Sequence, residues 1–320
     1  ETSDGGFEWF GRAPANKVLT AYGLLEFADM ARVYAVDPEV IRRTQSWLVW
    51  RQGPDGAWEP DSSSLRDGLY RDSFAGRYGT TAYIAWALLE SGYRGEATDR
   101  ALSFLSLRAG EVTDGYTLSL VANALLAAGR DADRLLEKLE AQAVEIDRKV
   151  RFQAGGRTAV YSAGNSADVE TTSLAVLALT RGGRTAKVQA ALDWLLSQRD
   201  AHGAWGSTQA TVLALRTLLS GSAAGQDDEA NAEVAVHVGA EQVEKLEIRP
   251  ESSDLVRTVD LTRFARPGEP LEVELAMTGK ARAQYQLVTL AWVPKPRPEE
   301  ALTLAVDFDR LTLAPDDTLT

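Results

Sequence analysis

Residues 197–215 read SQRDAHGAWGSTQATVLAL, and they combine a helix end, a glycine-tryptophan turn and the start of a new helix. Gly203 and Gly206 suit a positive φ or a close backbone approach, and Ser207 can accept hydrogen bonds from the first amides of the next helix. That helix, predicted over 207–220, is apolar almost all round, which is typical of a helix buried on both sides. We therefore expect an inner helix of a two-layered, all-helical assembly.

The same pattern recurs along the first two-thirds of the chain. A helix-start residue is followed seven positions later by Ala or Gly and then by Leu, at Asn16/Gly23/Leu24, Thr80/Ala87/Leu88, Thr117/Ala124/Leu125, Thr171/Ala178/Leu179 and Ser207/Ala214/Leu215. Such self-similarity predicts a repeat architecture, with the longer intervals carrying insertions. We interpret the small residue of each copy as the place where neighbouring inner helices approach closely, and we assign it no chemistry.

Amphipathic segments lie between the predicted inner helices, roughly at 38–51, 96–108, 131–145 and 185–199. Their apolar residues recur at helical spacing. Pro38 after Asp37 suits a helix start, and glycines at 92, 129, 182 and 183 suit helix ends. These segments predict outer helices, so inner and outer helices should alternate around a ring.

Three turns place an aromatic residue after glycine, at 4–9, 53–58 and 200–205. A large aromatic side chain in such a turn can fold back over a helix pair and close the gap between repeats. We expect Trp205 to be a buried structural wedge that closes the ring against the first visible repeat, rather than a residue that stacks on a ligand.

The composition limits the possible partners. The chain has 320 residues and a net charge of −12, with a pI of about 4.8, which argues against nucleic-acid binding because phosphate binding needs clustered Lys and Arg. No apolar run is long enough to cross a bilayer, so we expect no membrane contact by this chain. It begins without Met, in what looks like the middle of a repeat. We therefore expect an excised fragment whose opening helix pair is missing.

After a polar linker at 221–228 the apolar pattern changes from a helical period to a period of two. The strands predicted from it cover 234–238, 243–248, 255–261, 271–277 and 285–293, with turns at 267–270 and 278–280. Residues 293–298 are a proline-rich connector, and 302–308 look like the first strand of another domain. The expected fold is thus mainly α, an α/α toroid followed by an antiparallel β-sandwich-like domain.

The sequence contains few of the residues that covalent or metal chemistry needs. His202 and His237 are its only histidines, one in a turn and one in a predicted strand, and it has no cysteine. A Ser/His/Asp set and a His/Cys zinc site are therefore unsupported, and no Gly-rich phosphate loop follows a strand. We assign no catalytic, cofactor-binding or metal-binding residue.

The segments 59–78, 110–115 and 146–168 separate the helices. Some of their polar side chains could line a binding surface, although solvation is the favoured interpretation: Arg66, Asp67, Tyr70, Arg71, Asp72 and Tyr161.

Several stretches resemble the α2-macroglobulin and complement C3 family. They are Asp4–Asp29, Arg42–Pro60, Ala167–Ser173, Trp205–Leu219 and Met277–Trp292, with the run from Trp205 to Gln209 the most specific. The resemblance implies that residues 1–222 form a toroid like the family's thioester-containing helical domain and that 229–297 form the second part of a CUB-like β-domain. It also implies that 298–320 begin a receptor-binding or macroglobulin-like β-domain. Because Arg outnumbers Lys 27 to 7, we favour the bacterial branch.

The resemblance also implies a function. This sequence departs from the family pattern at the residues that carry the covalent chemistry. Family members are extracytoplasmic traps that enclose attacking proteases after cleavage of a bait region, which here implies the periplasm and a role in host defence. Their partners are target proteases and the other macroglobulin-like domains of the same protein. Their Cys-x-x-Gln thioester lies upstream of the Asp-Gly-Gly turn and is not present in this chain. The loop histidine that acts on the thioester in complement-type relatives is replaced by Arg66 or Asp67.

Two other classes of protein remain alternatives. An α/α-toroid enzyme of the terpene cyclase or prenyltransferase type would share the glycine-tryptophan turns, but it needs an aspartate-rich motif or an Asp/Cys/His zinc site that the sequence lacks. A thioester-less structural interaction module is the third interpretation. We expect a protease-trapping fragment that is not itself an enzyme and carries no cofactor.

Overall fold

The structure is a computed structural model, which describes residues 1–11, 13–61, 76–223, 231–249 and 257–281, together with 283, 285 and 287–289. It divides into compact units at 1–283 and 284–320, and all the elements named below belong to the first. The helices are α1 (Lys17–Met30), α2 (Pro38–Trp50), α4 (Arg77–Glu90), α5 (Glu96–Arg108), α6 (Gly115–Ala127), α7 (Asp133–Ala141), α8 (Gly164–Arg181), α9 (Val188–Ser197) and α10 (Thr208–Ala223).

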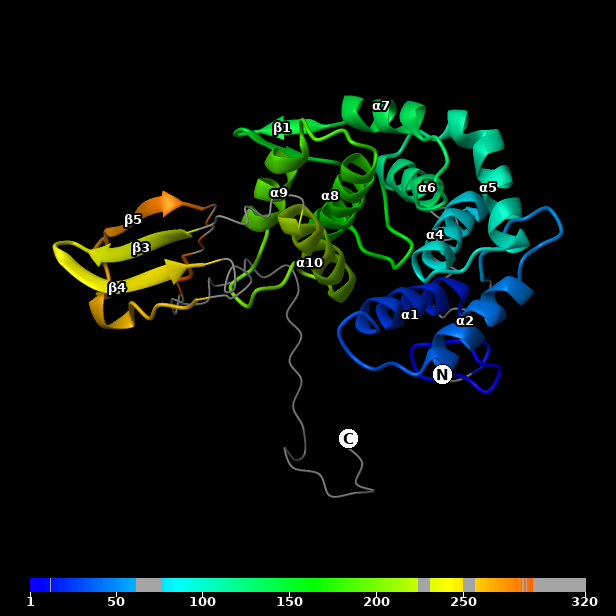
Figure 1. Ribbon diagram of the computed structural model, residues 1–320, viewed down its shortest axis with the longest axis horizontal. Helices are drawn as coiled ribbons and strands as arrows, with labels where there is room; N and C mark the ends of the chain where they lie inside the picture. The colour runs from blue at the N-terminus through cyan, green and yellow to red at the C-terminus, as the bar shows by residue number, and fades with distance from the viewer. Residues whose placement is uncertain are drawn as a thin grey trace, which may run out of the picture. The chain divides into compact units, whose positions relative to one another are not determined.

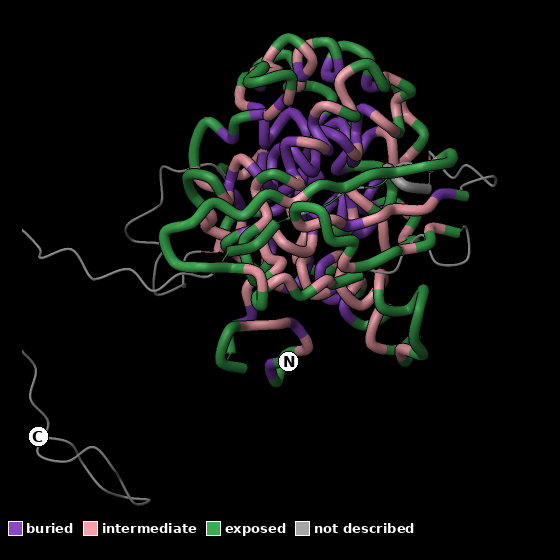
Figure 2. The backbone as a smooth tube through the Cα atoms, turned by 90° about the vertical axis from the view of Figure 1, so that its left-hand side faces the viewer, coloured by how far each residue is buried: buried purple, intermediate pink, exposed green. Residues whose placement is uncertain are grey.

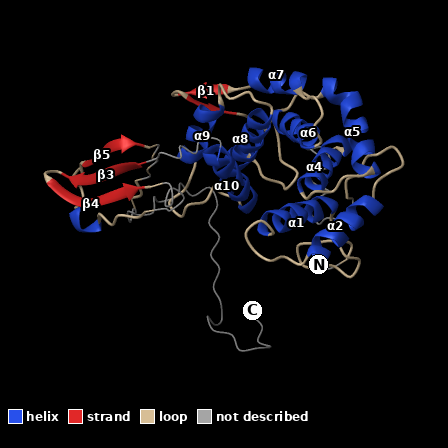
Figure 3. Cartoon of the chain, in the orientation of Figure 1, coloured by secondary structure: helices blue, strands red, loops and turns tan. Residues whose placement is uncertain are grey.

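Five of these helices form an inner layer and four form an outer layer (Figure 1). In the inner layer α1 packs on α4, α4 on α6, α6 on α8 and α8 on α10. The outer helices α2, α5, α7 and α9 each pack on the inner helix of their own repeat. This arrangement confirms the predicted alternation of inner and outer helices. Figure 3 shows the helices in blue and the strands in red.

The central inner helices are buried on all sides over most of their length, whereas α1 and α10 carry exposed apolar side chains, namely Met30, Leu215 and Leu219. Residues 79–89 of α4 and 115–125 of α6 are all buried, and Figure 2 shows the buried backbone gathered inside the helical part. The outer helix α5 buries only one stripe, which includes Ala101, Leu102 and Leu105. The nearly uniform apolar character of the inner helices thus follows from their position between two neighbours and an outer layer.

The helix starts were predicted correctly at two of the five repeats. Asn16 caps α1 by accepting from the amide of Leu19 at 2.9 Å, and Ser207 accepts from the amide of Ala210 at 3.1 Å. The predictions of Thr80, Thr117 and Thr171 as helix-start residues were wrong, because α4 begins at residue 77, α6 at 115 and α8 at 164.

At the start of α6 an aspartate performs the capping. Asp114 accepts from the amide of Thr117 at 2.8 Å, so Thr117 is already inside the helix. Aspartate is among the strongest N-cap residues. At α8 the helix extends seven residues before Thr171, which therefore lies in its middle.

Four of the inner helices each carry a threonine that makes the same hydrogen bond, and these threonines show which positions of the repeats are equivalent. Each hydroxyl accepts a hydrogen bond from the backbone amide of the aromatic residue in the preceding turn or strand. The pairs are Phe7–Thr20 at 2.9 Å, Trp58–Thr81 at 3.0 Å, Phe152–Thr172 at 2.9 Å and Trp205–Thr211 at 3.0 Å. We call these contacts the threonine staples. They fasten the turn between two helices to the inner helix that follows.

The aromatic turns are equivalent, as predicted. Gly53 donates to the carbonyl of Ala57 at 2.7 Å and Asp200 donates to the carbonyl of Ala204 at 2.8 Å, so the two turns close in the same way. Gly203 has a φ of +85°, which L side chains rarely adopt. The turn backbone therefore depends on glycine at this position.

Trp205 is buried, with 3% of its surface exposed, as predicted. Its indole Nε1 donates to the carbonyl of Leu195 at 2.5 Å, and Trp58 makes the same bond to Leu48 at 2.8 Å. The indole bond of Trp205 reaches α9 and its backbone staple to Thr211 reaches α10, so the turn joins these two helices. The prediction that Trp205 closes the ring against the first repeat is not supported by these contacts.

A β-hairpin that the sequence did not predict shortens the helix expected at 131–145. Strands β1 (Val144–Ile146) and β2 (Lys149–Arg151) pair antiparallel, and α7 ends at Ala141. Asp147 and Arg148 form the turn with φ of 49° and 64°. The helical periodicity of 131–145 extends into the hairpin, which explains the error.

The C-terminal part contains an antiparallel sheet in the order β4-β3-β5, from β3 (Asn231–Val238), β4 (Glu241–Ile248) and β5 (Val273–Lys280). The described part of the strand expected at 255–261 is not a strand, and a short 3₁₀ helix follows at Thr262–Phe264. The turn expected at 278–280 lies inside β5. Its Gly279 has a φ of +101° and lies so close to the backbone of Asn231 that a Cβ would clash, so this glycine serves strand pairing.

Parts of the remaining predictions fall outside the described residues. These parts are 224–228 of the linker, most of the strand at 285–293, and the whole of 298–320. Residues 221–223 of the expected linker belong instead to α10. The domain boundaries expected after residue 222, before residue 229 and after residue 297 stay predictions.

The threonine staples should contribute measurably to stability. Thr81→Val removes the acceptor for the buried amide of Trp58 without changing the side-chain shape, so the free energy of unfolding should fall by about 1–3 kcal/mol. The matched control is Thr44→Val in α2, where the buried hydroxyl donates only to the Val40 carbonyl of its own helix. Urea denaturation measures both, and equal losses would show that the staple contributes nothing of its own.

Candidate functional site

Polar side chains from all five inner helices converge near the amino-terminal ends of those helices. We call them the axial cluster, and its members are Tyr22 of α1, Tyr83 of α4, Tyr116 of α6, Glu170 of α8 and Gln209 of α10. The Gln209 side-chain amide donates to the Tyr83 hydroxyl at 3.3 Å, and Glu170 acts electrostatically on all three tyrosines. Each helix thus directs one polar group toward a common centre.

Glu170 is the most unusual member of the cluster. Its exposed fraction is 0%, and neither carboxylate oxygen makes a hydrogen bond of ordinary geometry to the described residues. Burial raises the pKa of this carboxyl to about 7, while the hydroxyls of Ser162 and Thr158 act in the opposite direction. Because a buried carboxylate without a cation is costly, Glu170 holds its proton in weakly acidic solution.

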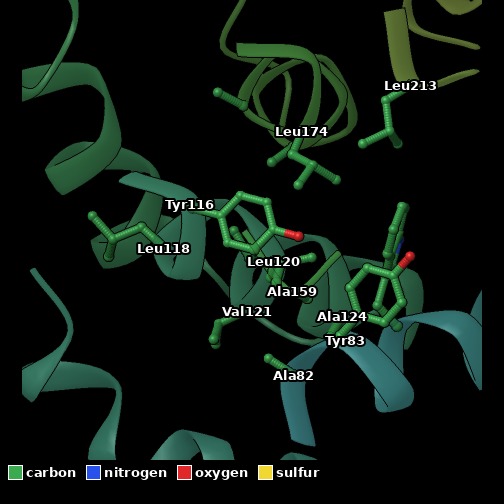
Figure 4. Close-up of a cluster of buried hydrophobic side chains, with 14 of the residues drawn as sticks. Ala82, Tyr83, Tyr116, Leu118, Leu120, Val121, Ala124, Ala159, Leu174 and Leu213 are labelled. Carbon is green, nitrogen blue, oxygen red and sulfur yellow. The ribbon is translucent and has the colours of Figure 1, made fainter. Parts of the chain in front are cut away.

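Two tyrosines enclose the centre of the cluster. Figure 4 shows Tyr83 and Tyr116 packed among apolar side chains that include Leu174 and Leu213. Both tyrosines are buried, and burial raises both phenol pKa values well above the ordinary range, with the charge of Glu170 as the next cause. The phenols therefore stay neutral and can act only as hydrogen-bonding groups.

A second acid lies on the same face of α1, four residues after Tyr22. Burial and the charge of Asp29 raise the pKa of Glu26 to about 7, and Arg216 opposes this. Burial, with the charge of Glu26 next, also raises the pKa of Tyr22 to about 12. The described inner helices thus contribute two carboxyl groups that change charge near neutral pH.

A loop packs against the Glu170 side of the cluster. We call residues 153–163 the cover loop. Thr158 is buried, its amide donates to the carbonyl of Ser162 at 3.0 Å, and the amide of Tyr161 donates to the carbonyl of Thr158 at 2.9 Å. The hydroxyls of Ser162 and Ser207 lie 3.4 Å apart, which joins the loop to the start of α10.

An open cavity of about 570 Å³ lies beside the cover loop. It is lined by Gln153, Ala154, Gly155, Gly156, Arg157, Ala163, Gly164 and Asp168. Asp168 is already engaged, because it pairs with Arg151 at 3.2 Å and accepts from the amide of Ala154 at 3.0 Å. The cavity thus adjoins the start of α8, two residues before Glu170.

The opposite ends of the inner helices carry compensated charges. Glu90 of α4 pairs with Arg181 of α8 at 2.7 Å and with Arg216 of α10, and Arg216 also pairs with Asp29 of α1 at 3.6 Å. Burial acts to raise the pKa of Glu90, but the two arginines hold it below its ordinary value. These ion pairs connect α1, α4, α8 and α10, so the carboxyl-terminal ends are tied by charge.

Of the six polar side chains that the sequence offered as lining a surface, the structure describes only Tyr161, so their assembly stays a prediction. Tyr161 lies in the cover loop, whereas Arg66, Asp67, Tyr70, Arg71 and Asp72 are outside the described residues. His202 lies in the exposed 200–205 turn, with its amide donating to Asp200 at 2.8 Å. His237 lies in β3, opposite Gln242 and Glu274 of the neighbouring strands.

Glu170 was missed as a site residue, although a signal was present. It is the only acidic residue from Val169 to Thr180, in a run of apolar, threonine and serine side chains. A lone acid in such a run predicts a buried charged group. Its partners could not be predicted, because they come from other helices and from the cover loop.

Among the described residues no group of three or more His, Cys, Asp or Glu side chains could hold a metal ion. A search of the same residues finds no helix long and apolar enough to span a membrane. The chemistry that the axial cluster offers is therefore proton binding and hydrogen bonding in a buried setting.

The ring of paired helices defines a thioester-type helical domain. The family model of the A-macroglobulin TED domain matches residues 1–220, and the chain belongs to this family of α2-macroglobulin and complement proteins. This finding confirms the resemblance predicted from the sequence.

Two curated relatives show similarity over the same part of the chain. Ovostatin of Gallus gallus is 30% identical over 238 residues, which are 69% of this chain and 16% of that protein. A.superbus venom factor 2 of Austrelaps superbus is 27% identical over 228 residues, 68% of this chain and 13% of that protein. The chain thus spans less than a fifth of the length of either relative.

The buried acid should make stability depend on pH. The pKa of Glu170 is raised on folding from 4.5 to about 7, so its contribution is fully present below pH 4.5 and is lost as the pH rises to 7. Glu170→Gln should abolish this loss, so that the difference in unfolding free energy between wild type and variant changes by roughly 3 kcal/mol from pH 4.5 to 7.5. Denaturant unfolding across that range measures the change, and a constant difference would contradict it.

Proposed function

We propose that this chain is the helical capture domain, with part of the adjoining β-domain, of a protease-trapping inhibitor that guards a bacterial cell envelope. The observation that carries the proposal is the family match across residues 1–220, together with a helical ring whose inner and outer layers are continuous over that range. The same proposal places the protein outside the cytoplasm.

The domain acts by binding rather than by turnover. The sequence has no cysteine and two histidines, and the histidines lie in a surface turn and in β3. Glu170 is enclosed, and the hydroxyls beside it come from Ser162 and Thr158 of the cover loop. In this proposal the partners are target proteases and the neighbouring macroglobulin-like domains, while the alternative toroid enzyme would need an acidic or metal motif that the sequence lacks.

This chain should form no covalent adduct with amines, because it has no thiol from which a thioester could be made. Incubation with methylamine followed by intact-mass spectrometry should leave the mass unchanged. A mass gain of one methylamine would contradict the proposal that this chain takes part in capture without forming covalent bonds itself.

The trapping proposal needs a test on the full open reading frame that contains this chain. After incubation with trypsin, the purified product should retain protease that still cleaves a small peptide substrate but no longer digests a large protein. Heat-denatured product is the matched control. If trypsin is not retained, or if it digests large proteins at its usual rate, the chain belongs to a structural module rather than to a trap.

A further inference from the structure

The cover loop and Glu170 form a closed unit. The loop is held at its start by the Phe152–Thr172 staple and by the bond from Ala154 to Asp168. Its middle brings Thr158 and Ser162 to the buried carboxyl. Between these anchors Glu170 has no access to water, so the loop is what separates this acid from solvent on its side of α8.

The groups that face Glu170 offer no compensating charge. Tyr22 of α1, Tyr83 of α4 and Tyr116 of α6 are the titratable groups that interact with it. The loop contributes two neutral hydroxyls, and α10 contributes neutral side chains. Among the described residues, no Lys, Arg or His forms an ion pair with Glu170. Its ionised form is therefore unfavourable while the loop is closed.

The loop also carries backbone strain. Tyr161 has a φ of +69°, a conformation that non-glycine residues adopt rarely and that costs on folding. The guanidinium of Arg157 donates to the carbonyl of Tyr161 at 3.4 Å. The positive φ of Tyr161 and the uncompensated acid thus lie in one unit, and both cost free energy while the loop is closed.

We propose that the cover loop is a proton-operated cover, closed over the inner helices when Glu170 is neutral and released when Glu170 ionises. Release hydrates the carboxylate and uncovers the amino-terminal ends of α8 and α10. The device works whether or not the chain takes part in protease capture, because it depends only on contacts within this domain.

The expected pH window follows from linkage. An open loop gives Glu170 water and an ordinary acidity near 4.5, whereas the closed loop keeps the proton until about pH 7. The equilibrium constant for opening should therefore rise with pH by up to about tenfold per unit between roughly pH 5 and 7 and level off above pH 7. The loop is most firmly closed in acid.

Hydrogen exchange followed by mass spectrometry tests the proposal on the whole chain between pH 5 and 8. After correction for the intrinsic exchange rate, amides of residues 155–163 should lose protection as the pH rises to 7. Glu170→Gln should remove this dependence. Glu26→Gln is the matched control, because Glu26 titrates in the same range on α1, and the loop should keep its pH dependence in that variant.

A second variant keeps the proposal testable if Glu170→Gln fails to fold. The hydroxyl of Ser162 lowers the pKa of Glu170, so Ser162→Ala should raise the pH at which the loss of loop protection levels off. The proposal is overturned if loop protection in the wild type is constant between pH 5 and 8. It is equally overturned if Glu170→Gln retains the dependence or if Glu26→Gln removes it.

Discussion

The helical architecture depends on one recurring contact, the hydrogen bond from the backbone amide that precedes an inner helix to a threonine hydroxyl on that helix. Threonines 20, 81, 172 and 211 make it at nearly equal lengths. A buried amide without an acceptor would cost stability, so the contact fixes where each connection enters the core. Because the connections into α1, α4, α8 and α10 are fixed in the same way, these helices pack alike against the segment that precedes them.

Buried acidic groups have different surroundings at the two ends of the inner helices. At the carboxyl-terminal ends Glu90 is neutralised by Arg181 and Arg216, and arginine there also suits the negative end of the helix dipole. At the amino-terminal ends Glu170 has tyrosines, hydroxyls and an amide around it, and no cation of the described residues pairs with it. Ion pairs thus join the carboxyl-terminal ends, whereas the amino-terminal ends contain an acid whose charge depends on solvent access and pH.

This asymmetry places the chemistry of the domain at the amino-terminal ends of α8 and α10, where the cover loop meets Ser207. The helical domain combines a frame held together by buried contacts with a loop that lies over a buried acid. The staples and the Glu90 ion pairs provide the frame. The cover loop combines the positive φ of Tyr161 with an acid that no cation among the described residues compensates.

The sequence by itself determined the alternation of inner and outer helices and the equivalence of the aromatic turns, because apolar periodicity and glycine positions are local properties. The family was indicated by the resemblance of particular stretches, above all the run from Trp205 to Gln209. The sequence also placed α5 at its observed bounds. Only the tertiary structure decided the register of the repeats, which depends on bonds between distant residues such as Trp58 and Thr81. The raised pKa of Glu170 likewise depends on the tertiary structure, because the helices and the loop that bury this residue are separate in the chain.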